Sequence, residues 1–375
     1  MKNNKQIQRL ADIVVKESLQ IKEGDKLLLN FSVGGIELAK IIGYEAAKLG
    51  AAVISRCVEK EVEAAILDGV GKNQKAEILT EMVMGENSDI AWANKIFYIR
   101  SNDNPQVWDR VNPKILGEYH KALYPSQKIR VERRRWSLLY LPTTAEAKKD
   151  KIKFLEYEKL FFKACNRPWK EIEKAQQILI DKYLDPGKDL EITAGKTYLK
   201  MNISKQKFEN STIECNIPGS EVFSSPVRGT IEGQLILPYP VMFAGKCLPN
   251  IELYFEKGKV VKHKTSDKNG QQFLEEQLNL DEGAREVGEI ALGTNSVFKR
   301  PFLNGLFVEK VGGSGHIAIG CSYQGKVDNG VRSANHVDLT FMMLSKFGGG
   351  KVVVDGKIIQ KNGKFLDKKL DILNH

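Results

Sequence analysis

The sequence has few cysteines, and they are scattered. There are five among 375 residues, and no two of them form a Cys-x-x-Cys pair. Thiolate zinc sites and redox dithiols usually depend on such closely spaced pairs, so we expect neither. We interpret the five cysteines as reduced thiols that are mostly buried in the core.

Long apolar runs are also missing. No apolar segment approaches the roughly 20 residues that a membrane-spanning helix needs. The N-terminal segment, MKNNKQIQRLADIVV, is polar and then amphipathic, and it lacks the apolar core of a secretory signal. These absences predict a cytoplasmic protein that has no membrane partner.

The glycine motif of dinucleotide-binding proteins is incomplete. The nearest candidate, Gly34-Gly35, is not followed by the third glycine of G-x-G-x-x-G. The third glycine allows close packing of the helix on the strand, so we do not expect a dinucleotide site.

Acidic residues are outnumbered by basic ones, which gives a net charge of +10. The densest basic segment is KIRVERRR at 128–135. Nucleic-acid binding is one interpretation of such a segment. However, Ile129 and Val131 alternate with the charges, and an apolar run follows at 136–141, so we favour a solvated strand edge and no nucleic-acid partner. Basic charge near a pocket would also attract the carboxylate end of a peptide.

A chain of this length suggests two domains. In the first part, apolar runs typical of buried strands alternate with helical patterns. The expected strands are 26–31, 51–57, 95–100 and 136–141, and the expected helices are 5–20, 36–49 and 76–84. Strands that alternate with long helices indicate parallel pairing, so we predict an α/β N-terminal Rossmann-like domain over residues 1–185.

The pattern changes after Asp185-Pro186-Gly187, where we place the domain boundary. Short alternating strands separated by Gly, Pro and Asn then favour antiparallel pairing. They are expected at 190–193, 198–203, 230–237 and 251–255, with a hairpin turning at Asp355-Gly356. With helices expected at 270–278 and 281–290, residues 186–375 are predicted to form a β-rich α+β metal-binding domain.

Possible metal ligands are concentrated between 308 and 338. This segment contains Glu309, His316, Tyr323, His336 and Asp338. His336 and Asp338 would point to the same face of a strand, because side chains alternate there. Each residue also has an ordinary interpretation. His336 and Asp338 could be a surface pair, His316 a core histidine and Tyr323 a half-buried aromatic residue. Glu309 could be a solvated charge after an apolar strand, GLFV.

Two upstream glutamates extend the set. Glu221 lies between turn residues and beside Val222 and Phe223, where a carboxylate is costly unless it is paired or bound to metal. Glu289 is expected on the helix 281–290. It could simply be solvated there, because it would share a helical face with Glu282 and Glu286. Four carboxylates and two imidazoles without a cysteine suit two divalent ions that share a bridging carboxylate and a water molecule.

These motifs together resemble the aminopeptidase T/aminopeptidase S family of metallopeptidases, the thermophilic aminopeptidases. The matching segments are NIPGSEVFSSP at 216–226, DEGAREVGEIALGTN at 281–295, VEKVGGSGHIAIG at 308–320 and ANHVD at 334–338, and more loosely YLPTTAEA at 140–147. Tyr323 stands seven residues after His316, as in the family pattern. VEK departs from it, because an aspartate often precedes the glutamate, and the span from His316 to His336 is short.

The resemblance implies a metal-dependent aminopeptidase that acts on peptides with a free N-terminus, as a homodimer. It implies two divalent ions (Zn, Co, Mn or Mg) and Tyr323 as a catalytic residue that stabilises the oxyanion. The implied metal ligands are Glu221, Glu289, Glu309, His316, His336 and Asp338. Glu221 is also our candidate for the catalytic group that moves a proton to the leaving amine.

Two other functions compete with this one. His316, His336 and Asp338 alone make the two-histidine, one-carboxylate set of mononuclear Fe(II) oxygenases, and some ring-cleaving dioxygenases are similar to the peptidase family in fold. The three glutamates favour the peptidase, because the oxygenase does not need them. A non-catalytic basic binding protein would require the same side chains to be dispersed in space.

Overall fold

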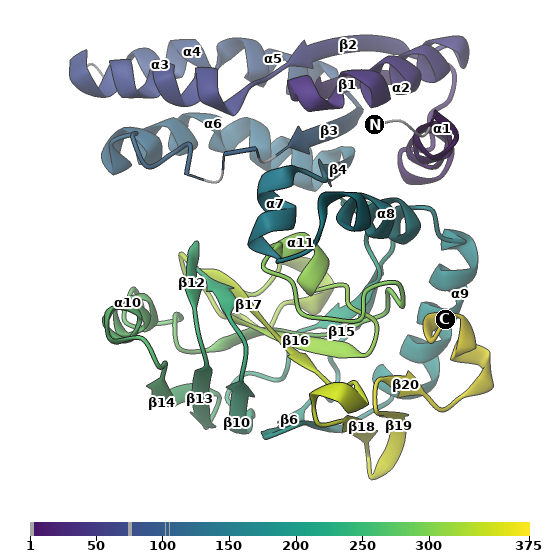
Figure 1. Cartoon of the computed structure of the whole chain (residues 1–375), viewed down its shortest axis with the longest axis vertical. Coiled ribbons are helices and arrows are strands. Elements are labelled where there is room, and N and C mark those ends of the chain that lie inside the picture. Colours follow the sequence, from purple (N-terminus) through teal and green to yellow (C-terminus); the bar gives the residue numbers. More distant parts are fainter. Residues whose placement is uncertain (1–3, 74–76, 102, 105) are drawn as a thin grey trace. The chain divides into compact units, whose positions relative to one another are not determined.

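The computed structural model describes residues 4–73, 77–101, 103–104 and 106–375 (Figure 1). By their internal contacts they form two compact units. The first is Met1–Asn166 with Ile213–Ile217, and the second is Arg167–Thr212 with Pro218–His375. The domain boundary that we placed near residue 185 from the sequence stays a prediction.

The first unit is built on a parallel sheet. Its strands follow the order β2-β1-β3-β4-β8. They are β1 (Lys26–Phe31), β2 (Ala52–Cys57), β3 (Lys95–Ser101), β4 (Arg135–Leu141) and β8 (Asn216–Ile217), and every pairing is parallel. The four strands expected from the sequence are therefore confirmed. Ile96–Ile99 are buried without a break, as in strands whose two faces are both covered.

Helices connect these strands and supply the rest of the first core. They are α1 (Asn4–Asp12), continued by η1 (Ile13–Ser18), and α2 (Ile36–Lys48), α3 (Lys60–Asn73), α4 (Ile78–Met82), α5 (Met84–Trp92), α6 (Pro113–Arg133), α7 (Thr144–Lys149) and α8 (Phe154–Cys165). None of the helices in the described parts of the chain combines the length and apolar character needed to cross a membrane.

The basic segment at 128–135 is not a strand edge, so that expectation is wrong. Most of it is the C-terminal end of α6, and only Arg135 belongs to β4. The buried residues of α6, among them Ile115, Tyr119 and Leu123, recur at helical spacing and fix which face packs inward. Basic side chains at the end of a helix are stabilised by its dipole.

The second unit contains a large antiparallel sheet of order β14-β13-β10-β6-β5-β18-β19-β20. Its strands are β5 (Asp189–Ala194), β6 (Thr197–Asn202), β10 (Glu232–Leu237), β13 (Ile251–Glu256), β14 (Lys259–Lys264), β18 (Gly350–Val354), β19 (Lys357–Lys361) and β20 (Lys364–Phe365). The predicted hairpin between β18 and β19 is confirmed, with positive φ angles at Asp355 and Gly356. The expected helix near 270–278 is α10 (Lys268–Leu278).

A second antiparallel sheet in this unit has the order β17-β16-β15-β9-β7. Its strands are β7 (Glu209–Ser211), β9 (Glu221–Ser224), β15 (Val287–Gly293), β16 (Ser314–Gly320) and β17 (His336–Met342). In Figure 1 β15, β16 and β17 run side by side. Every residue of β15 and β16 is buried, so polar side chains on them face the interior.

Smaller elements complete the second unit. They are α9 (Trp169–Leu179), η3 (Ile180–Leu184), α11 (Gly305–Val308), η6 (Lys368–Leu373) and the hairpin of β11 (Val241–Phe243) with β12 (Lys246–Leu248). The described residues thus form a mixed α/β protein with a five-stranded parallel sheet and antiparallel sheets of eight, five and two strands.

Two local expectations in the second unit are wrong. Residues 281–290 do not form a helix, because β15 begins at Val287 and carries Glu289. A Cβ at Gly288 would lie 2.4 Å from the carbonyl oxygen of Gly320, so the glycine permits close strand packing. The segment GLFV before Glu309 is the helical turn α11 and not a strand.

Candidate metal centre

The candidate ligands lie on one face of the smaller sheet because of its register. Ala318 on β16 is opposite Glu289 on one side and Asp338 on the other. Residues directly opposite each other in antiparallel strands point to the same face, and the small alanine leaves space between the two carboxylates. His316 and His336 lie two residues from Ala318 and Asp338, so they share this face.

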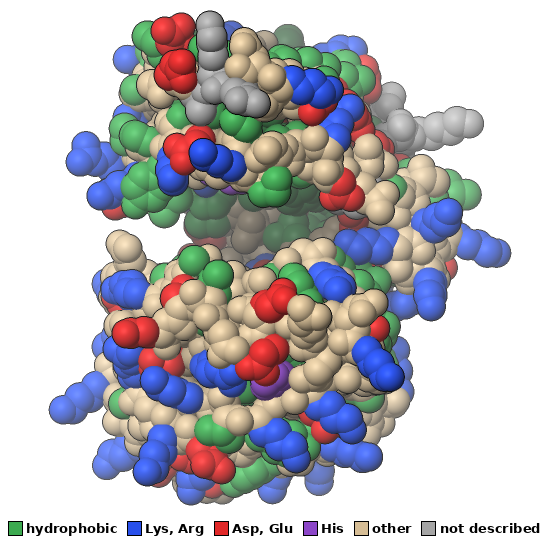
Figure 2. All heavy atoms as spheres, turned by 90° about the vertical axis from the view of Figure 1, so that its left-hand side faces the viewer, with side chains coloured by type: hydrophobic (Ala, Val, Ile, Leu, Met, Phe, Trp, Pro, Cys, Tyr) green, Lys and Arg blue, Asp and Glu red, His purple; other side chains and the backbone are tan. Residues whose placement is uncertain are grey.

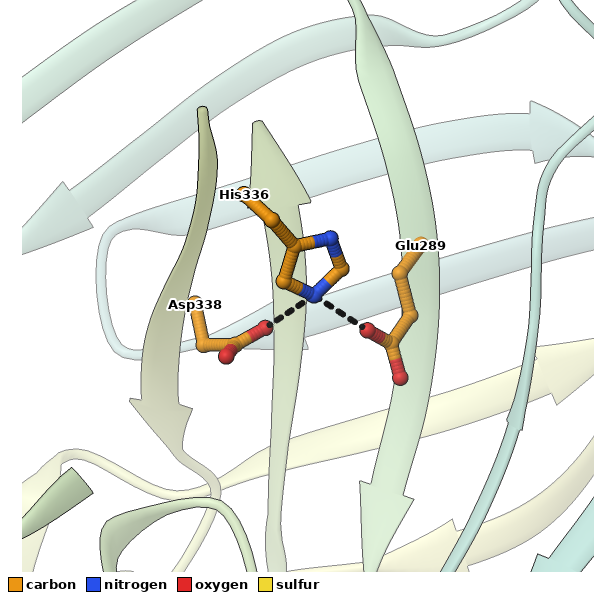
Figure 3. A group of neighbouring side chains, drawn as sticks. All are labelled: Glu289, His336 and Asp338. Atoms are coloured by element: carbon orange, nitrogen blue, oxygen red, sulfur yellow. Dashed lines mark ion pairs between the residues drawn. The ribbon is translucent and has the colours of Figure 1, made fainter. Parts of the chain in front are cut away.

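Three of these side chains form a tight cluster (Figure 3). The His336 Nε2 atom lies 3.1 Å from Glu289 Oε2 and 3.4 Å from Asp338 Oδ1. One donor atom from each residue lies within 4.8 Å of the others. Donors bound to one tetrahedral ion at about 2.0–2.1 Å lie about 3.3 Å apart, so the spacing fits a single divalent cation.

Several buried donor atoms of this region have no hydrogen-bond partner. They are Glu221 Oε2, Glu289 Oε2, His316 Nδ1, His336 Nε2 and Asp338 Oδ1. The Glu289 and His336 atoms are close but are not aligned for a hydrogen bond. Buried polar atoms without partners are destabilising, and a cation bound among them would satisfy most of the set.

A backbone contact orients His336. Its Nδ1 atom lies 2.7 Å from the carbonyl oxygen of Cys321. A carbonyl can only accept a hydrogen bond, so Nδ1 carries the proton and Nε2 faces Glu289 and Asp338. Histidines that bind metals are commonly oriented in this way.

His316 is buried beside the cluster, 1% exposed. Its Nε2 atom lies 3.5 Å from Glu289 Oε1, and 3.9 Å from both Glu221 Oε2 and Asp338 Oδ1. Burial alone would lower the pKa of His316, but the surrounding carboxylates, Glu289 first, raise it to about 9. Burial is likewise outweighed at His336, whose pKa is raised to about 11 by Asp338 and Glu289.

The carboxylates respond in the opposite sense. Burial alone would raise the pKa of Asp338, but pairing with His336 and His316 holds it below its usual range. The pKa of Glu289 is also lowered, because the two imidazoles outweigh its burial. Without a cation, the site is therefore a network of imidazolium and carboxylate groups.

Lys310 was not among the site residues predicted from the sequence. Its Nζ atom lies 2.5 Å from Glu221 Oε1 and 3.0 Å from Glu309 Oε2, and the residue is 1% exposed. Burial would lower the pKa of Lys310, but the attraction of Glu221 and Glu309 raises it. No local pattern in the sequence marks this lysine as buried.

Glu309 and Glu221 thus share an ammonium group. Burial raises the pKa of Glu309 to about 8, with Asp338 and Glu221 adding to the rise and Lys310 opposing it. Glu221 begins β9 and is 7% exposed. The structure brings all six predicted ligands into one region, with Glu289, His336 and Asp338 at its centre.

The backbone before Glu221 is held tightly. The Gln176 side-chain amide donates to the Glu221 carbonyl oxygen at 3.2 Å and to Thr294 Oγ1 at 2.9 Å. A Cβ at Gly219 would lie 1.6 Å from the carbonyl oxygen of Thr212. Gln176 was not predicted from the sequence, because it lies on α9 and contacts a residue 45 positions away.

Tyr323 lies in the loop after β16 and is 47% exposed. Its ring packs 4.9 Å from the His336 ring and 5.6 Å from the Phe223 ring, measured between centroids. Local desolvation and the nearby carboxylates raise the pKa of its phenol well above the usual value. The phenol therefore stays protonated near neutral pH and remains a hydrogen-bond donor.

A cavity of about 200 Å³ adjoins the cluster. Its wall includes Glu309, His336 and Asp338 together with apolar residues such as Met242, Phe302 and Leu303. A ligand in this cavity would meet both carboxylates and apolar surface.

Comparison with known proteins shows what the chain is related to. The pattern of the family described as "Thermophilic metalloprotease (M29)" matches residues 3–340. The chain belongs to this M29 family. The family membership predicted from the sequence is thereby confirmed.

Individual relatives agree with the M29 assignment. "Aminopeptidase AmpS" of Bacillus subtilis (strain 168) is 22% identical over 398 residues, which cover 92% of this chain and 94% of that protein. "Aminopeptidase 2" of Geobacillus stearothermophilus is 24% identical and covers 96% and 95%. "Aminopeptidase T" of Thermus thermophilus is 32% identical over 143 residues, 37% of this chain and 34% of that protein.

Two solved structures resemble the whole M29 chain. "Wild-type AmpT from Thermus thermophilus" has a TM-score of 0.79 and 18% identity, covering 97% of this chain and 99% of that one. A 2,5-dihydroxypyridine dioxygenase from Pseudomonas putida KT2440 has a TM-score of 0.61 and 11% identity, covering 99% and 100%. At these identities the likenesses show the fold alone, and the mixed α/β fold matches that of AmpT.

Proposed function

We propose that this M29 protein is a metal-dependent aminopeptidase that removes the first residue of peptides with a free N-terminus. The predicted enzyme class, a metalloaminopeptidase, is confirmed by the family and by the named aminopeptidases among its relatives. The observation that carries the substrate proposal is the cluster of Glu289, His336 and Asp338. Its donor atoms lack hydrogen bonds and lie beside a cavity that is lined by both apolar and charged residues.

The residues present fit a divalent cation. Glu289, His336 and Asp338 would hold it, with His316 beside them, and this oxygen and nitrogen donor set without cysteine suits Zn, Co, Mn or Mg. When bound, the cation would supply a water molecule of lowered pKa and polarise the scissile carbonyl.

The chain's own residues would do the remaining work. The protonated Tyr323 phenol would donate a hydrogen bond to the oxyanion that develops on the scissile carbonyl. Glu221 stays our candidate for moving a proton to the leaving amine, and its Oε2 atom has no hydrogen-bond partner. Glu309 is a second candidate, because a pKa of about 8 lies close to neutral pH.

The cavity beside the cluster suits the N-terminal end of a peptide. Its apolar wall would receive the side chain of the first residue, and Glu309 and Asp338 would face the α-ammonium group. On the face shown in Figure 2, Lys and Arg side chains are mixed with Asp and Glu instead of forming one basic stripe. This face therefore lacks the continuous basic surface that is typical of nucleic-acid binding.

Other predictions from the sequence are kept as proposals. They are a homodimer, a cytoplasmic location and a Rossmann-like first domain. The strand order β2-β1-β3-β4 supports a doubly wound, Rossmann-like arrangement. The number of ions depends on Lys310, which lies between Glu221 and Glu309.

The dioxygenase alternative is not favoured. Its two-histidine, one-carboxylate set would group His316, His336 and Asp338, but the donor closest to His336 Nε2 among its charged partners is Glu289. The similarity to the Pseudomonas putida enzyme is weaker than that to AmpT and concerns the fold.

The test is turnover of leucine p-nitroanilide by wild-type protein and by Glu289→Gln, each with added Co²⁺, Zn²⁺, Mn²⁺ or Mg²⁺. The wild type should release p-nitroaniline, and Glu289→Gln should not. Neither protein should hydrolyse N-acetyl-leucine p-nitroanilide, which has no free N-terminus. Undiminished turnover by Glu289→Gln, or no turnover of any aminoacyl substrate by the wild type, would refute the proposal.

A further inference from the structure

Lys310 occupies the space between two of the predicted metal ligands. Its ammonium group contacts Glu221 Oε1 and Glu309 Oε2. Glu221 lies 89 residues away from Lys310 in the sequence. Its backbone is also held, because the Lys310 N–H donates to the Phe307 carbonyl oxygen and its own carbonyl accepts from Asn295. The side chain is almost fully enclosed by the protein.

The predicted ligands therefore divide into two groups. Glu289 Oε2, His336 Nε2 and Asp338 Oδ1 converge and have no hydrogen-bond partner. Glu221 and Glu309, in contrast, already share a cation of the protein's own. The first group has three donor atoms without hydrogen bonds that can bind one divalent ion, whereas one oxygen of each carboxylate in the second group is held by Lys310.

Electrostatics opposes a second ion beside the ammonium. A divalent ion bound to Glu221 and Glu309 would have to use the same carboxylates and lie within a few ångströms of Nζ. Like charges repel more strongly in a buried site than in water. Lys310 would have to leave its enclosed position before such an ion could bind.

We infer that Lys310 takes the place of the second cation, so that each chain binds one divalent ion, held by Glu289, His336 and Asp338. The ammonium group places one positive charge between Glu221 and Glu309 and holds one oxygen of each carboxyl group in position. This inference rests on the proposed function only for the presence of the first ion, and it replaces the two ions expected from the sequence with one.

The experiment is a count of bound metal. Full-length wild-type protein is dialysed against Co²⁺ or Zn²⁺, freed of unbound metal, and analysed by mass spectrometry for metal per chain. A parallel titration follows the visible absorption of Co²⁺ as it binds. We expect one ion per wild-type chain and a single break in the titration, whereas two ions per wild-type chain would overturn the inference whatever any variant does.

Variants then test Lys310 itself. Lys310→Gln and Lys310→Met remove the charge, and either should raise the count from one ion to two. Lys310→Arg keeps the charge and should stay at one, and Lys346→Gln, at an exposed lysine far along the chain, controls for loss of a charge. A folded neutral variant that still binds one ion would overturn the inference, because Lys310 would then not be what excludes the second ion.

Thermal melting provides a second measurement on the same proteins. Removing the ammonium leaves two buried carboxylates unpaired, so Lys310→Gln should melt below the wild type without metal. Added Co²⁺ should raise its melting temperature by more than that of the wild type, and an equal rise would contradict the inference. Peptide hydrolysis by the wild-type protein is assayed separately. A wild-type protein that binds one ion but does not hydrolyse peptides would refute only the proposed function. A wild-type protein that hydrolyses peptides and binds two ions would refute only the inference of a single ion.

Discussion

The backbone carbonyl oxygen of Cys321 accepts the Nδ1–H of His336 across 2.7 Å. This contact fixes the imidazole so that Nε2 points at Glu289 and Asp338. The contact is made by the peptide group of Cys321 and not by its thiol. The orientation of one metal-binding side chain therefore depends on the path of the chain between β16 and β17.

The first prediction separates the peptide of Cys321 from its side chain. Cys321→Ala should bind metal and turn over substrate as the wild type does, because the carbonyl group remains. His336→Gln should lose metal affinity by more than the 10–100-fold that is typical of residues that only orient a ligand. Isothermal titration with Zn²⁺ measures both, and a Cys321→Ala protein with weakened metal binding would contradict the backbone account.

The second prediction concerns two neighbouring glutamates of similar burial. Glu289→Gln should weaken metal binding by more than about 100-fold, because it removes a charged donor. Glu286→Gln is the matched control, since Glu286 is 4% exposed but pairs with Arg228 at 2.7 Å and 2.9 Å. It should lower the melting temperature without changing metal affinity. Equal losses of affinity in both variants would show that the effect is general destabilisation.

The third prediction tests the phenol of Tyr323. Tyr323→Phe should reduce kcat by about 10²–10³-fold, the usual cost of one lost donor to an oxyanion, with little change in KM. Metal content should not change. Tyr254→Phe is the control, because that hydroxyl contacts Glu252 on β13. A Tyr323→Phe enzyme that loses metal or only raises KM would assign the tyrosine a different role.

The fourth prediction is that the metal-free protein loses stability as pH rises from about 6.5 to about 9. The pKa of His316 is raised from 6.5 to about 9 and that of His336 to about 11, so their stabilising charges are complete below 6.5 and are lost as pH rises through those values. The raised pKa of Glu309, about 8, acts in the same direction. Asp338 and Glu289, whose pKa values are lowered, lose their contribution only in acid.

Calorimetry of the protein in a chelator, at pH 6.5, 8 and 9, checks this trend. The metal-loaded protein should show a smaller fall, because its ligands are already unprotonated. Metal binding at pH 7 should also release protons, which appears as a dependence of the binding enthalpy on the buffer. A metal-free protein that becomes more stable between pH 7 and 9 would contradict the charge assignment.

The fifth prediction concerns the tight backbone before Glu221. Gly219→Ala should destabilise the protein by about 1–3 kcal/mol or more, because the new methyl group would overlap the Thr212 carbonyl. Gly117→Ala, inside α6 with nothing within 4 Å, should instead stabilise by about 0.5–1 kcal/mol. Denaturant unfolding compares the two, and a neutral Gly219→Ala would show that the segment relaxes easily.

Much of the fold could be predicted from local patterns. The strands of the parallel sheet were recognisable because each is a short apolar run between helical patterns, as at Lys26–Phe31. The wrong predictions of helix and strand came where residues fit both the two-residue spacing of a strand and the helical spacing. Ile129 and Val131 alternate like a strand, yet they lie on a helix, and the acidic residues before Glu289 have helical spacing although Glu289 lies on a buried strand.

The sequence by itself determined the types of donor, their order along the chain and the alternation that puts His336 and Asp338 on one face. Those features suffice to identify the M29 family. The tertiary structure decided which donors meet. A bulge between Val287 and Glu289 shifts the register so that Glu289 faces Ala318 and Asp338, and no local pattern encodes that shift.

The tertiary structure also decided the place of Lys310. In the sequence it is one of many lysines and follows Glu309 without any mark of burial. In the folded chain it lies against Glu221, 89 residues away, because β9 and the turn after α11 meet in the interior. A contact between residues so far apart depends on the packing of whole strands, and so it becomes visible only once the chain is folded.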